Sequence, residues 1–94
     1  MSRGAVGIIE TKGFVNMTFI LDHMIKSADV ELVKYEHVGS GMVSAVVWGD
    51  LASVKHAVEI GIEEARAEGI AISHCILAKL RVGTLSFLLD GEVP

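Results

Sequence analysis

Residues 30–48 read VELVKYEHVGSGMVSAVVW, and this stretch decides the fold. Two runs rich in valine and aromatic residues, 30–38 and 42–48, flank the short connection Gly39-Ser40-Gly41. β-Branched and aromatic residues favour strands, and a short glycine-bearing loop between two such runs is typical of a β-hairpin. The stretch therefore predicts two antiparallel strands joined by a tight loop.

On each side of this hairpin, the sequence predicts one helix and one further strand. The β-branched run 5–11 predicts the first strand, and residues 70–80 predict the last. Residues 14–28 carry apolar side chains at helical spacing, and Asp50 is a suitable N-cap for a helix that extends to about Glu68. The resulting order predicts an α+β, ferredoxin-like fold, in which an antiparallel βαββαβ sheet carries both helices on one face.

The composition predicts one small domain, residues 1–94, that associates with other chains. The chain has 94 residues, of which 51% are apolar, and its mean hydropathy is +0.52. A lone domain of this size cannot bury so much apolar surface. The apolar face of the helix at 14–28 is also wider than one sheet requires, so we expect it to contact a second copy. Residues 82–89 predict a short C-terminal helix, followed by a tail.

Charge and hydropathy exclude several functional classes. The net charge is −4, with 8 basic and 12 acidic residues, which argues against a nucleic-acid partner. No stretch approaches the ~20 consecutive apolar residues of a membrane span, and the first residues do not resemble a signal peptide. We therefore expect a soluble, cytosolic protein.

The sequence offers no catalytic residue, metal site or cofactor site. The single cysteine, Cys75, lies in the apolar run 72–77 and is expected to be buried. Its neighbour His74 should point to the opposite face of the strand, so the two cannot form a dyad. The remaining histidines, His23, His37 and His56, lack the spacing of helical metal ligands.

Several sequence blocks, taken in order, resemble the hexamer-forming, single-domain shell proteins of bacterial microcompartments (the BMC domain family). The resemblance runs from Gly4 to about Leu80, without insertions. The blocks are AVGIIETKG at 5–13, DHMIKSA at 22–28, VKYE at 33–36, VGSG at 38–41, VWGD at 47–50 and VK at 54–55. The order of the blocks is that of the unpermuted branch of the family.

The resemblance implies a non-enzymatic protein of a microcompartment shell in the bacterial cytoplasm. Family members form homo-hexamers that tile, with other shell proteins, into a sheet around encapsulated enzymes, and small metabolites cross a central pore. The resemblance assigns two sets of residues. The pore-lining set is Val38, Gly39, Ser40 and Gly41, with His37 at one mouth; the set at the hexamer edge is Lys26, Asp29, Lys79 and Arg81. Lys79 stands where the family usually carries arginine, so Arg81 is a second candidate for that contact.

Two other functions are compatible with a ferredoxin-like layout. One is an oligomeric regulatory domain that binds a small ligand, although such a module needs a pocket or a long loop. The other is a small enzyme with its site at a subunit interface, although the chain lacks a convincing acid–base or nucleophile pair. Lattices seen by electron microscopy would favour the shell protein.

Overall fold

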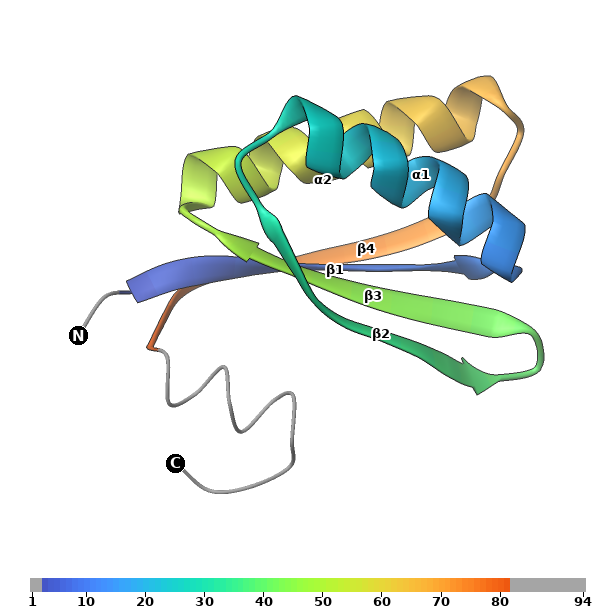
Figure 1. Ribbon diagram of the computed structural model, residues 1–94, viewed down its shortest axis with the longest axis horizontal. Coiled ribbons are helices and arrows are strands. Elements are labelled where there is room, and N and C mark those ends of the chain that lie inside the picture. The colour runs from blue at the N-terminus through green and yellow to red at the C-terminus, as the bar shows by residue number, and fades with distance from the viewer. Residues whose placement is uncertain (1–2, 82–94) are drawn as a thin grey trace.

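The computed structural model describes residues 3–81, which form the six elements that the sequence predicts. These are β1 (Arg3–Lys12), α1 (Phe14–Ser27), β2 (Glu31–Gly39), β3 (Met42–Gly49), α2 (Leu51–Ala67) and β4 (Ile72–Arg81) (Figure 1). Each begins within two residues of its predicted start. The helix predicted at 82–89 lies outside the described residues.

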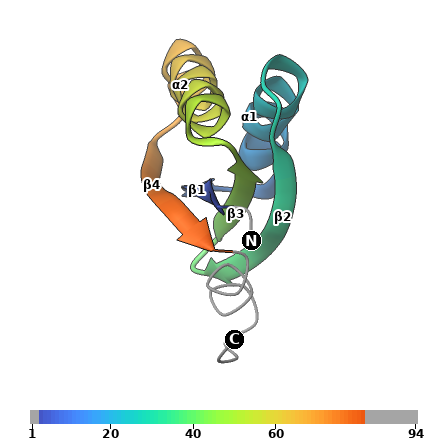
Figure 2. The ribbon, with the colours of Figure 1, turned by 90° about the vertical axis from the view of Figure 1, so that its left-hand side faces the viewer.

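The four strands form one antiparallel sheet in the order β2-β3-β1-β4. Both helices lie on the same face of this sheet, and the described residues leave the other face without a helix (Figure 2). This arrangement confirms the predicted ferredoxin-like α+β fold. We call the two faces the helix face and the open face.

The core lies between the helix face and the two helices. It contains alternate residues of the central strands, such as Ile9 and Val47, together with Met17, Ile20 and Met24 of α1. Apolar spacing along α2 predicts a core stripe of Val54, Ala57, Val58, Gly61, Ile62 and Ala65. The structure buries all of these except Ile62, which is partly buried against the core. Both helices thus bury their apolar residues against the same face of the sheet.

Local chemistry explains where α2 begins and ends. The Asp50 carboxylate accepts hydrogen bonds from the Ser53 backbone N–H at 2.9 Å and the Ser53 hydroxyl at 2.8 Å, as expected of an N-cap. The backbone hydrogen bond holds the pKa of Asp50 below its ordinary value. At the other end, α2 ends at Ala67 with Glu68 as its C-cap, and Gly69 adopts a left-handed φ of 68° that turns the chain out of the helix.

The apolar face of α1 is wider than the part of it that packs against the core. Met17, Ile20, Leu21 and Met24 are buried, whereas Phe14, Val15 and Ile25 remain exposed. The surplus of apolar surface that the sequence predicts is therefore present on a single chain. Within residues 3–81, neither helix is long and apolar enough to cross a membrane.

Candidate functional site

The loop between β2 and β3 has an unusual backbone. Gly39, Ser40 and Gly41 have φ angles of 104°, 54° and 78°, so three successive residues have positive φ. Glycine adopts such angles without steric cost, whereas serine does so only in the small left-handed region. The Gly-Ser-Gly sequence thus allows a sharp reversal that leaves Ser40 exposed at its tip.

This loop is fastened to the turn between β1 and α1. The Gly13 backbone N–H donates a hydrogen bond of 2.9 Å to the Gly41 carbonyl oxygen. The side chain of Lys12 also lies along Gly41, because a Cβ built on Gly41 would be 3.5 Å from Lys12 Cε. Both contacts hold the loop in a definite position at the end of the sheet.

Aromatic rings connect α1 to the strand that leads into the loop. The ring of Tyr35 packs edge to face against the rings of Phe14 and His37, with centroid-to-centroid distances of 6.1 Å and 6.0 Å. The Tyr35 hydroxyl is buried and has no hydrogen-bond partner among the described residues. His37 itself is exposed and lies two residues before Gly39, the first residue of the loop.

Apolar side chains are exposed around this end of the molecule. Phe14 is 58% exposed, Val15 76% and Val38 45%. Phe14 and Val15 open α1, and Val38 immediately precedes the loop, so all three lie where the hairpin ends (Figure 1). We call this set the hairpin-end patch.

The residues that the resemblance assigns to a hexamer edge lie at the other end of α1. Lys26 is in the last turn of this 14-residue helix and forms an exposed ion pair of 2.9 Å with Asp22. Asp29 follows in the exposed turn before β2. A helix of this length spans about 21 Å, so Lys26 is well separated from the loop.

Lys79 and Arg81 belong to the last residues of β4, and the structure does not describe their side chains. The backbone of Arg81 pairs with that of Arg3 at the start of β1. This position is at the end of the sheet opposite the hairpin loop, the end at which α1 finishes (Figure 1).

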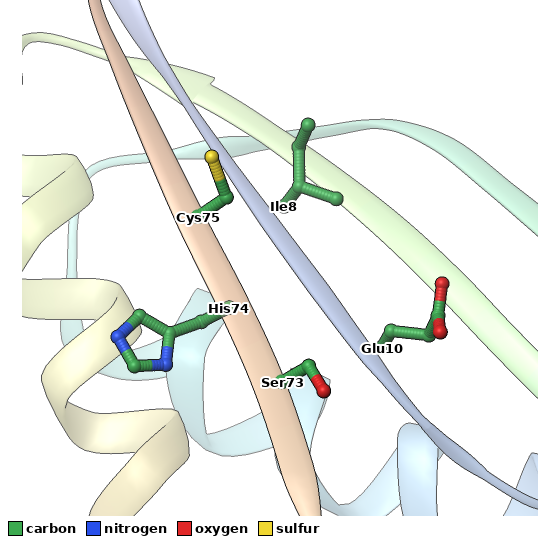
Figure 3. A pocket seen from close by; sticks show the side chains of 5 residues that line it. All are labelled: Ile8, Glu10, Ser73, His74 and Cys75. Atoms are coloured by element: carbon green, nitrogen blue, oxygen red, sulfur yellow. The ribbon is translucent and has the colours of Figure 1, made fainter.

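The expectation that Cys75 is buried is wrong. Cys75 is exposed, because β4 is an edge strand and Cys75 pairs with Ile8 on the open face. It borders a shallow hollow of about 200 Å³ with Ile8, Glu10, Ser73 and His74 (Figure 3). The side chains of His74 and Cys75 diverge from adjacent positions, as alternation along a strand requires (Figure 3). The hollow therefore holds no Cys–His dyad.

The structure adds two features that the sequence analysis does not predict. Glu64 lies half-buried between the helices, with Oε2 3.7 Å from Nε2 of His23. Lys12 lies beside Gly41 of the hairpin loop. No pattern of neighbouring residues indicates either contact. His23 and Glu64 lie on different helices, and Lys12 reaches the loop only because β1 pairs with β3.

The family model described as BMC domain matches residues 5–80. The chain belongs to the BMC domain family.

Relatives within this family include shell proteins named for two kinds of compartment. The carboxysome shell protein CcmK2 of Synechococcus elongatus is 44% identical over 77 residues, covering 80% of this chain and 76% of the relative. The bacterial microcompartment shell protein PduA of Citrobacter freundii is 45% identical over 69 residues, covering 73% of this chain and 74% of the relative.

Longer BMC proteins match as well. The carboxysome assembly protein CcmO of Synechocystis is 42% identical over 77 residues, but this chain spans only 25% of its length. The crystal structure of a microcompartment protein from Desulfitobacterium hafniense superposes with a TM-score of 0.77 at 26% identity, over 87% of this chain and 44% of that one. These relationships confirm the BMC fold and support a structural, non-enzymatic role in a shell.

Proposed function

We propose that this BMC domain chain is a shell protein that forms a ring of six copies, with the loop Gly39–Gly41 on the axis. The observation that carries the proposal is the placement of two features at opposite ends of α1. A fastened, exposed Gly-Ser-Gly loop surrounded by the hairpin-end patch is at one end, and the exposed Lys26 and Asp29 are at the other. A flat ring needs one end of each subunit at its centre and the other at its rim.

The centre of such a ring forms a pore for small metabolites. Closed symmetry copies the loop around the axis and converts one Ser40 into a ring of hydroxyl and amide groups. Val38, Gly39, Ser40 and Gly41 line this passage, and His37 lies near one mouth. Backbone N–H groups freed by left-handed glycines favour polar or anionic solutes.

The rim of the ring makes the contacts between hexamers. Lys26 is 73% exposed and its ammonium has donors left after the bond to Asp22, so it can donate to a carbonyl of the next hexamer. Asp29, Lys79 and Arg81 complete this edge. A charge-assisted hydrogen bond contributes about 1.5–3 kcal/mol, and repetition around the rim multiplies this effect.

Lys26→Ala tests the rim contact between hexamers, and Ser40→Leu tests the pore. Lys26→Ala should abolish extended lattices in electron micrographs while hexamers persist in sizing chromatography. Lys55→Ala, at an exposed lysine of α2, is the matched control and should tile normally. Lattices that persist in Lys26→Ala would show that this lysine is only a solvated surface residue.

Ser40→Leu tests the pore. In closed shells that contain a reporter enzyme, this substitution should slow entry of a small polar substrate at least several-fold, because six apolar side chains would narrow and dehydrate the passage. Unchanged entry would remove the pore assignment. Discrete trimers that bind a small molecule tightly would instead favour a regulatory domain and contradict the shell proposal altogether.

A further inference from the structure

The two faces of the sheet present different side chains next to the hairpin loop. Residues directly opposite each other in an antiparallel pair share a face, and successive residues alternate between faces. His37 is paired with Val43, which is buried under the helices, so His37 lies on the helix face. Lys12 follows the buried Thr11 and pairs with Met42, so Lys12 lies on the open face.

Lys12 is the charged residue that the structure places against the loop. Its stem passes beside Gly41, with Cε 3.5 Å and Cγ 3.8 Å from the position that a Cβ would occupy on that glycine. Lysine commonly packs its methylene stem on a surface and keeps its ammonium in water. The residue is exposed, and within residues 3–81 no carboxylate lies at ion-pair distance from its ammonium.

The acidic groups nearby do not cancel this charge. Glu10 and Glu36 share the open face with Lys12, since both pair with Ser44 of β3. Glu36 is 3.7 Å from the ammonium of Lys34 and is compensated by it. Glu10 lies two residues back along β1, farther from the loop than Lys12, and borders the hollow near Cys75 (Figure 3).

We propose that Lys12 determines the charge selectivity of the pore: in the ring, six ammonium groups surround the open-face mouth and favour anionic metabolites over neutral ones. The inference rests on the proposed pore and adds a fixed charge to a loop that otherwise has only amides and hydroxyls. A ring of like charges raises the local concentration of counter-ions. Salt screens the effect over a Debye length of about 10 Å at 0.1 M ionic strength.

The experiment compares entry of lactate with entry of the uncharged lactamide into closed shells made with each variant. Lys12→Met keeps a long apolar stem against Gly41 and removes the charge. It should lower the lactate-to-lactamide ratio several-fold at low salt, because all six ammonium groups of the mouth attract the same anion. Lys12→Arg should retain the parental ratio, and Lys55→Met, near the start of α2 at the other end of the sheet, should do the same.

A merely structural role for Lys12 predicts a different pattern. If the stem only supports the loop, Lys12→Met changes neither the ratio nor its salt dependence, and the proposal is overturned. Parental shells supply an independent test, because their lactate preference should fall as salt is raised from about 0.02 M to 0.5 M. A preference that does not depend on salt also overturns the proposal.

The pore itself is tested in the same assay by Ser40→Leu. If Ser40→Leu slows both solutes but Lys12→Met leaves the ratio unchanged, the pore stands and the role of Lys12 fails. If Ser40→Leu slows neither solute, the proposed pore fails. The two failures are therefore distinguishable.

Discussion

The two helices begin at opposite ends of the sheet, and the two ends are finished differently. At the start of α2, Asp50 caps the helix through Ser53. At the start of α1, Gly13 provides no side-chain cap, and the first two helical residues, Phe14 and Val15, are exposed and apolar. The start of α2 therefore has its backbone capped within the chain, as on the surface of a monomer. The start of α1, with its exposed apolar residues, has the character of a surface that another subunit covers.

The glycines at these two regions show the same contrast. A Cβ on Gly7, beneath α2, would lie 2.9 Å from Val58, 3.0 Å from Val54 and 3.2 Å from Val47. A Cβ on Gly39, in the hairpin loop, would meet nothing within 4 Å. One region has no spare volume in a single chain, and the other is open.

The largest expected effect on stability comes from filling the closed region. Gly7→Ala should lower the free energy of unfolding by about 1–3 kcal/mol, because the three valines are stiff at χ1 and cannot move aside. Urea denaturation, read by circular dichroism, measures the change. An unchanged midpoint would show that the space beneath α2 is looser than the distances indicate.

Gly61→Ala is the matched control for Gly7→Ala. A Cβ at Gly61 would be 2.8 Å from the Met24 sulfur and 3.2 Å from Ile20 Cγ2; the tighter of the two contacts is to the flexible Met24 side chain, which can shift. Alanine also stabilises a helix interior by about 1 kcal/mol relative to glycine. The two effects oppose each other, so Gly61→Ala should change the stability much less than Gly7→Ala.

A smaller effect is expected at the capped start of α2, and it depends on pH. The pKa of Asp50 is lowered in the folded state, so its contribution to stability is present at neutral pH. It is lost as the pH falls from about 4, the ordinary value of aspartate, through the lower folded value. Asp50→Ala should therefore lower Tm at pH 7 and reduce the loss of stability on acidification.

Asp50→Ser separates the effect of the N-cap hydrogen bond from the effect of ionising the Asp50 carboxyl group. Serine can accept the same bond from the Ser53 backbone N–H but does not ionise. Its Tm at pH 7 should lie close to that of the parent, with a flatter dependence on acid pH. An acid dependence equal to that of the parent would assign the transition to other carboxylates.

The smallest effect on folding is expected in the hairpin-end patch, where a substitution should instead have a large effect on assembly. Val15→Asp should change the free energy of unfolding by no more than about 0.5 kcal/mol, because Val15 is 76% exposed and an acidic residue suits the first turn of a helix. It should nevertheless dissociate the rings, since it places a charge in the hairpin-end patch. Light scattering measures the particle mass.

Ile25→Asp is the control for position along α1. Ile25 is also exposed, but it lies in the last turns of the helix, away from the hairpin-end patch. Rings should therefore survive this substitution. Intact rings in Val15→Asp, or dissociation in both variants, would contradict the assignment of the patch to the ring contact.

The sequence by itself determined the element order, the N-cap at Asp50, the buried stripe of α2 and membership of the BMC domain family, because each depends on residues close together in the chain or on the order and spacing of short motifs. The tertiary structure decided what depends on neighbours that are distant in sequence. Cys75 is exposed because β4 is an edge strand, and no local pattern reports which strand becomes an edge. Lys12 meets the hairpin loop because β1 pairs with β3, which brings positions 12 and 41 together in space.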